Sequence, residues 1–298
     1  MSDDVWESGS GGPNSGGDDS MGVPDYENGS LPNETFSVDA VFKAGLAFLQ
    51  EAPAVALLGG FNMLLIAFLP SLIATPLSVA VTVTAQQSGL DDMAVQGLSQ
   101  LSSMAVQLVF WPITQLVVAG IIVSAAKWIR TDEADISSLY TSVGAAVRAF
   151  LATLVAAIIS FLAALVTMVP AMLAIGVGIG IDNVTLGLGL GGLLFIPAFF
   201  VMVYVGLGVQ LTVYAAVLDG LGPIEAVQRS WEAASGTRVT LFVTGFVFGI
   251  LGSVAACMCF LPLMLVVPIQ QGGMTAAWLR YARHSDESSK YPFFERNV

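Results

Sequence analysis

Residues 219–242, DGLGPIEAVQRSWEAASGTRVTLF, decide the fold of this chain. The stretch predicts a short amphipathic helix that lies at a membrane surface and leads directly into a membrane-spanning helix. Pro223 marks its start, because proline at the first helical position loses no N–H group that the helix needs. The side chains that follow divide at helical spacing into an apolar and a polar face. The apolar face consists of Ile224, Val227, Trp231 and Ala234, and the polar face of Glu225, Gln228, Arg229 and Glu232.

The same stretch contains a predicted ion pair and the residue that ends the helix. Glu225 and Arg229 are four residues apart, in the order that favours a helical ion pair. Gly236 ends the helix, and Arg238 then lies at the level of the lipid head groups. From Val239 onward the chain is uncharged for long enough to enter lipid. We call this succession of interfacial helix, bend and span an elbow.

The composition is that of an integral membrane protein. Hydrophobic residues make up 55% of the chain and charged residues 11%, whereas soluble domains carry about 25% charged residues. The basic residues form no dense patch, which argues against a nucleic-acid partner. Two cysteines and one histidine exclude a disulfide framework, a Cys/His zinc site and a bis-histidine haem, so we expect no metal and no cofactor.

The acidic charge is concentrated near the N-terminus. The net charge is −12, and 10 of the 22 acidic residues lie in the first 51 positions. Residues 1–35 are also rich in Gly, Ser, Asn and Pro, and such a segment buries too little apolar surface to offset its ordering entropy. We expect a disordered acidic tail, for which a solvated leader is favoured over a docking motif.

The charges divide the rest of the chain into membrane-spanning tracts. Each tract is long enough for the roughly 20 apolar residues of one crossing, and the last is long enough for two, with a turn near Cys257. This assignment places all ten Lys and Arg residues on one side, as the positive-inside rule requires. We therefore expect six spans in the cytoplasmic membrane, with both termini in the cytoplasm. The uncharged tracts are 52–90, 93–126, 149–181, 183–218 and 239–279.

The predicted fold class is all-α, with six transmembrane helices in three elbow-plus-hairpin repeats. The membrane domain covers residues 36–284, and a cytoplasmic C-tail, 285–298, follows it. The expected spans lie near 54–80, 103–126, 149–172, 192–217, 239–257 and 261–281. The expected interfacial helices lie near 37–50, 134–146 and 223–235.

Three heptapeptides carry the repeat: VDAVFKA (38–44), ISSLYTS (136–142) and IEAVQRS (224–230). The outer two share the order aliphatic, acidic, Ala, Val, variable, basic, small, so Asp39 and Lys43 are expected to pair in the first elbow. The middle copy keeps the apolar spacing but loses both charges. Chance similarity stays open as an explanation of that copy.

The elbow and two further segments resemble a known group of proteins. The segments are GPIEAVQRSWEAASGTRVTLF (222–242) after a span that ends in LDG, the opening FSVDAVFKA (36–44) and the closing LRYAR (279–283). They are similar to prokaryotic six-helix membrane proteins, which include the membrane domain of some glycerophosphodiester phosphodiesterases and stand-alone relatives of unknown function. The resemblance implies the six-helix architecture. It implies no phosphodiesterase activity, because we find no soluble domain for the catalytic residues. The matching elbow residues are Pro223, Glu225, Ala226, Arg229, Ser230 and Trp231.

Polar side chains are few within the expected spans. These spans contain no Asp, Glu, Lys or His and no internal Arg, which argues against an ion-coupled transporter and an intramembrane enzyme. Gln107 and Gln115 lie eight residues apart, roughly on one helical face, and with Trp111 and Gln210 they are candidates for a polar cavity. Hydrogen bonds between helices, worth about 0.6 kcal/mol each, are the competing and favoured interpretation.

These features favour a non-enzymatic membrane protein that organises or assists a membrane lipid or a membrane-protein partner, with its elbows at the inner leaflet. The partner is either another protein or a second copy of the chain. The alternative is a transporter or facilitator for a neutral or lipid-like molecule, which the repeats and the glutamine face favour. An enzyme ranks third, because its candidate groups, such as Asp219, Glu225 and Glu232, already have roles in the elbow.

Overall fold

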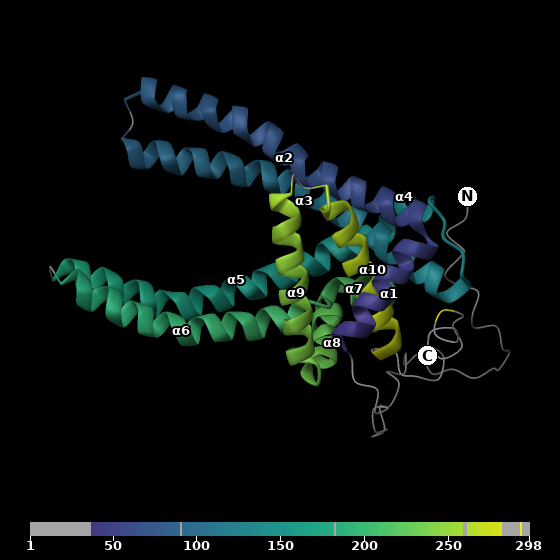
Figure 1. Cartoon of the computed structure of the whole chain (residues 1–298). Coiled ribbons are helices and arrows are strands. Elements are labelled where there is room, and N and C mark those ends of the chain that lie inside the picture. Colours follow the sequence, from purple (N-terminus) through teal and green to yellow (C-terminus); the bar gives the residue numbers. More distant parts are fainter. Residues whose placement is uncertain (1–36, 90, 182, 259–260, 282–292, 294–298) are drawn as a thin grey trace, which may run out of the picture. The chain divides into compact units, whose positions relative to one another are not determined.

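The structure is a computed structural model that describes residues 37–89, 91–181, 183–258, 261–281 and 293. These residues belong to one unit of the chain, Thr35–Val298, and they form α-helices and no strand (Figure 1). The predicted all-α fold class is confirmed for this part. The predicted tail, 1–35, and all of the C-tail except Phe293 lie outside it. The helices are α1 (Val38–Glu51), α2 (Pro53–Gln87), α3 (Asp92–Thr131), α4 (Ser138–Thr141), α5 (Val143–Gly180), α6 (Val184–Val209), α7 (Thr212–Leu218), α8 (Pro223–Ser235), α9 (Arg238–Cys257) and α10 (Leu263–Tyr281).

Five helical segments are long and apolar enough to cross a membrane. They coincide with the first five spans that the sequence predicts, and they identify the chain as an integral membrane protein. They are Pro53–Gln87, Asp92–Thr131, Val143–Gly180, Val184–Leu218 and Arg238–Cys257.

The sixth predicted span, 261–281, is occupied by α10, which is not among these five. Residues 272–279 of α10 are all buried between other helices. A helix enclosed by protein does not need the continuous apolar surface that lipid requires, and α10 accordingly carries Gln270, Gln271 and Thr275. The sixth crossing therefore stays a prediction.

Two pairs of helices form long hairpins, α2 with α3 and α5 with α6, in which the partners lie side by side (Figure 1). The α5–α6 hairpin is closely packed near its turn, because Gly178 and Gly187 bring the two backbones together where a Cβ atom would collide. The longest helix, α3, has 40 residues and is therefore about 60 Å long. The hydrocarbon core of a bilayer is about 30 Å thick. The hairpins are thus longer than the expected spans.

The α2–α3 hairpin is polar at its turn. Residues 84–103, TAQQSGLDDMAVQGLSQLSS, lie beyond the apolar part of the hairpin. Asp91 caps α3 there, because its carboxylate accepts a hydrogen bond of 2.7 Å from the N–H of Ala94. Polar side chains of this kind suit helices that continue past the hydrocarbon layer, which accounts for the extra length of α2 and α3.

The core lies where α1, α3, α7 and α10 meet. Phe48 of α1 and Trp128 of α3 are fully buried, with ring centroids 5.4 Å apart. Glycines allow the backbones to approach closely: a Cβ atom on Gly273 of α10 would collide with the carbonyl of Val41, and one on Gly45 of α1 with the carbonyl of Ile269. The first helix of the fold is therefore locked against the last.

The middle interfacial helix, expected near 134–146, is replaced by other structure. Only the four residues Ser138–Thr141 form a helix, and α5 begins immediately afterwards at Val143. The cause is local: Asp135 accepts hydrogen bonds from the N–H and the hydroxyl of Ser137, which stabilise a turn in place of a helical start. The other two predicted segments are helices, α1 and α8, and their location at a membrane surface stays a prediction.

Candidate functional site

The candidate site lies where α8 meets the break between α6 and α7. Ser230 of α8 is fully buried, and its hydroxyl donates a hydrogen bond of 2.7 Å to the carbonyl of Gly208. The same hydroxyl oxygen accepts a bond of 3.1 Å from the N–H of Leu211. Both backbone groups lie at the interruption of the helical hydrogen-bond pattern, so the serine provides the partners that the broken helix lacks. The elbow helix is in this way bound to the preceding span.

Trp231, the next residue of α8, packs directly on the same helix. A Cβ atom on Gly208 would collide with the indole ring. The ring of Tyr204, one turn earlier on α6, meets the indole edge-on with centroids 5.7 Å apart. The guanidinium carbon of Arg238, the first residue of α9, lies 3.7 Å from the Tyr204 centroid and 5.1 Å from the Trp231 centroid. We call Tyr204, Trp231 and Arg238 the Arg238 cluster.

Among the described residues, Arg238 contacts aromatic side chains and no acidic side chain. Its Nε atom is enclosed and has no hydrogen-bond partner. Within the part of the chain that the structure describes, no carboxylate comes within 4.0 Å of its guanidinium. In contrast, Lys43 lies 2.8 Å from Asp39, as predicted, and both are exposed to the surroundings. Among the described residues, the contacts that stabilise the positive charge of Arg238 are therefore those with the two ring faces.

The predicted ion pair between Glu225 and Arg229 is wrong. Arg229 lies 3.6 Å from Glu232, three residues further along α8. Glu225 instead accepts a hydrogen bond of 3.3 Å from the N–H of Gly222. A glutamate at the third helical position reaches back to the residue before the helix, which satisfies an N–H group that no carbonyl can reach. Helix α8 begins at Pro223, the first residue after Gly222, as the sequence predicts.

Both ends of α8 have a local cause or anchor. Helix α8 ends at Ser235, immediately before Gly236. Before the start of the helix, Asp219 accepts a hydrogen bond of 3.2 Å from the indole N–H of Trp278 on α10. Gly220 next to it has a φ of +67°, a conformation that favours glycine. The elbow is therefore anchored to α10 as well as to α6.

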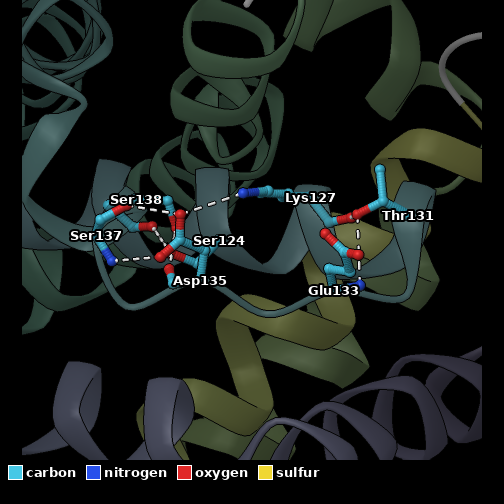
Figure 2. Close-up of polar contacts among 8 residues, drawn as sticks. Ser124, Lys127, Thr131, Glu133, Asp135, Ser137 and Ser138 are labelled. Atoms are coloured by element: carbon cyan, nitrogen blue, oxygen red, sulfur yellow. Dashed lines mark hydrogen bonds and ion pairs between the residues drawn. The ribbon is translucent and has the colours of Figure 1, made fainter.

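A second polar cluster holds the turn between α3 and α5 (Figure 2). The ammonium group of Lys127 lies 3.2 Å from a carboxylate oxygen of Asp135, and the hydroxyl of Ser137 donates a bond of 2.6 Å to the same oxygen. The hydroxyls of Ser124 and Ser138 are 2.6 Å apart. The hydrogen bond from the Ser137 hydroxyl, followed by the Ser137 N–H and Lys127, lowers the pKa of Asp135 to about 2. These contacts connect α3 to α4, and we assign them a structural role.

The structure does not bring the candidate glutamines together. Gln107 is exposed on α3, whereas Gln115 is buried and its side-chain carbonyl oxygen has no hydrogen-bond partner. Trp111 packs edge-on against Phe150 of α5, with centroids 5.4 Å apart. Gln210 lies half-buried at the break after α6. Eight residues turn a helix by more than two whole turns, and the remaining rotation is enough to separate Gln107 from Gln115.

Sequence reasoning missed Tyr204 and Gly208 as parts of the site. Tyr204 lies near the end of an apolar helix, where interfacial aromatic residues gather, and this was the available signal. Nothing in the sequence indicates that its ring faces Arg238, because the contact depends on how α8 packs against α6.

Comparison with known proteins places the chain in a family. In the residues that the structure describes, no group of three or more His, Cys, Asp or Glu side chains is arranged to hold a metal ion. No curated protein and no solved structure matches the sequence. One family model matches residues 36–287, and its description is Domain of unknown function (DUF7847). This match covers most of the chain, including every described helix, and the chain therefore belongs to the DUF7847 family.

Proposed function

We propose that the chain is a non-enzymatic multi-pass membrane protein that organises or assists a lipid or protein partner. The observation that carries the proposal is the exposure of the hairpins. The most apolar stretch of α2 contains no buried residue, and large side chains such as Leu72, Phe161 and Phe200 are more than 60% exposed. Apolar faces of this extent are in contact with lipid or with another protein in a membrane.

The contacts of the elbows support the proposed threefold repeat. Helix α4, which lies where the middle interfacial helix was expected, packs on α3; α8 packs on α5, α6 and α7; and α1 packs on α10. The short helix α4 and the elbow helix α8 thus each contact the last helix of the unit before them, and α1 contacts the last helix of the third unit. A glycine lies at each contact: Gly120 opposes Leu139, Gly208 opposes Trp231, and Gly273 opposes Val41. Val41 and Leu139 occupy the same position in the aligned heptapeptides.

The proposed location is the cytoplasmic membrane, with the elbows at its inner face. The basic residues Lys43, Arg130, Arg229 and Arg238 all belong to the elbows or to helix ends beside them, which agrees with the positive-inside rule. The kinship with the membrane domain of glycerophosphodiester phosphodiesterases is part of the proposal too. It rests on the elbow motif GPIEAVQRSWEAASGTRVTLF (222–242).

Native mass spectrometry of the protein extracted gently from its own membrane tests the proposal. We expect a bound protein, a second copy of the chain or a stoichiometric lipid. The proposal would be overturned if the protein, reconstituted alone, turned over a substrate or moved a solute across vesicles.

A facilitator for a neutral or lipid-like molecule is the second candidate. The break between α6 and α7 favours it, since broken helices line the binding sites of many transporters. The hydroxyl of Thr212 at this break is buried without a hydrogen-bond partner, and so is the side-chain oxygen of Gln115 on α3. If this candidate is right, Gln115→Leu abolishes flux in proteoliposomes and Gln107→Leu, at an exposed position of the same helix, does not.

A further inference from the structure

The Arg238 cluster has hydrogen-bond donors that no described residue uses. Arg238 forms no hydrogen bond with any described residue. Its Nε is enclosed, whereas its two terminal nitrogens are not among the enclosed atoms without partners. The terminal nitrogens of the half-buried Arg238 are therefore partly accessible from the surroundings, with four N–H donors between them. The hydroxyl of Tyr204, a side chain that is 48% exposed, also has no partner among the described residues.

The position of the cluster limits what reaches these donors. Arg238 is the first residue of α9, and Val239 after it is 78% exposed at the start of the apolar helix. Tyr204 lies near the C-terminal end of α6, and both rings belong to the types that gather at membrane interfaces. With the fifth span beginning at Val239, we expect the guanidinium group at the boundary of the hydrocarbon layer. An unpaired charge at such a boundary is only partly solvated by water, so an anion there is favoured.

We propose that the Arg238 cluster binds the phosphate group of an anionic membrane lipid. A guanidinium group binds phosphate through two parallel N–H···O bonds, which a single ammonium group cannot provide. The rings of Tyr204 and Trp231 hold the plane of the guanidinium fixed, so little side-chain entropy is lost on binding. The inference rests on the proposed function and deepens it, because it names a lipid class as a partner and places its site where α6, α8 and α9 meet.

Arg148 provides the matched control. It is also near the start of a spanning helix, α5, and it is exposed. It has no ion pair among the described residues, but none of the described aromatic rings stacks on it. Arg148→Gln therefore removes the same charge from the protein without removing the stacked geometry.

The experiment is a titration of the purified full chain with phosphatidylglycerol or phosphatidylcholine, read by native mass spectrometry. We expect the wild type to bind one phosphatidylglycerol in preference to phosphatidylcholine. Arg238→Gln should weaken that site by about tenfold or more, since a charge-assisted bidentate contact is lost. Arg148→Gln should leave it within about twofold, a difference that corresponds to less than about 0.5 kcal/mol. A separate titration with inorganic phosphate distinguishes a lipid site from a site for the free ion.

Three results would overturn the inference. They are an unchanged affinity in Arg238→Gln, an equal loss in both glutamine variants, and displacement of the lipid by millimolar inorganic phosphate. If Arg238→Gln does not fold, Arg238→Lys keeps the charge but lacks the planar fork, and its affinity should still fall; an unchanged affinity in this variant also contradicts the proposal. Solute flux by the protein alone would refute the proposed organising role without affecting this measurement.

Discussion

Removal of the Ser230 hydroxyl tests whether α8 holds the break in the fourth span. Ser230→Ala deletes one oxygen atom and creates almost no cavity. It leaves the carbonyl of Gly208 and the N–H of Leu211 without the partners they have at 2.7 and 3.1 Å. A buried polar group without a partner costs about 1–3 kcal/mol, and a carbonyl tolerates the loss better than an N–H. We therefore expect the free energy of unfolding to fall by about 2–4 kcal/mol.

The assay is reversible unfolding of the protein in mixed micelles with increasing dodecyl sulfate, followed by tryptophan fluorescence. Ser235→Ala is the control, because its exposed hydroxyl binds only the carbonyl of Glu232 within the same helix. We expect this variant to lie within about 0.5 kcal/mol of the wild type. If Ser230→Ala were as stable as Ser235→Ala, the break would not depend on the elbow, and the reasoning would be refuted.

Three further predictions concern packing, pH and the buried glutamine. Gly273→Ala should destabilise the fold by about 1–3 kcal/mol in the same assay, because its Cβ atom collides with the carbonyl of Val41. Gly249→Ala on α9, with no atom within 4 Å of the added carbon, should be neutral or slightly stabilising. Asp135 has a pKa lowered to about 2 in the folded protein, from an ordinary value of 3.8, so its contribution is complete above about pH 4 and is lost as the pH falls through 2. The melting temperature of Asp135→Asn should therefore fall less than that of the wild type as the pH is lowered from about 4 to 2. Equal falls in the two proteins would contradict a stabilising role for the ionised Asp135. Gln115→Leu should leave stability unchanged or raise it by about 1 kcal/mol, because it removes a buried oxygen that lacks a partner. A clear loss of stability would mean that Gln115 bonds to a neighbouring helix.

The sequence predicts the helical elements well because their signals are local. The start of α8 follows from Gly222 and Pro223, and the five long apolar helical segments follow from the uncharged tracts. Each of these signals acts within one helix, through hydropathy, proline geometry or a cap, and does not depend on the packing of the chain.

The errors have tertiary or competing local causes. The sequence position of Glu225 allows either an ion pair with Arg229 or a hydrogen bond with the N–H of Gly222. In the structure Glu225 forms the hydrogen bond, and Arg229 pairs with Glu232. The turn at Asp135 replaces the middle interfacial helix, because hydrogen bonds from Ser137 compete with helix formation. The burial of Ser230 on α8 was also missed, because its hydroxyl has partners only at the helix break on another helix.

The sequence indicates some residues of the candidate site but not how they come together. The sequence places Trp231 on the apolar face of the elbow helix and Arg238 at the head-group level, but Tyr204 joins them only through the packing of α6 on α8. The proposed glutamine face also depends on packing that the sequence does not show. A spacing of eight residues describes a helix viewed alone, and the neighbours of α3 bury Gln115 while they leave Gln107 exposed.

The unequal lengths of the spanning helices have a consequence for the surrounding membrane. Helix α9 has 20 residues and is about 30 Å long, whereas α5 has 38 residues, is about 57 Å long and carries a single charged side chain, Arg148. A bilayer of one thickness matches α9 and is too thin for an upright α5, so the long hairpin inclines or the lipids beside it stretch. Both responses have a free energy that changes by a fraction of a kcal/mol per Å of bilayer thickness. The protein is therefore sensitive to the thickness of its membrane, and in a membrane with thick and thin regions it would be sorted between them.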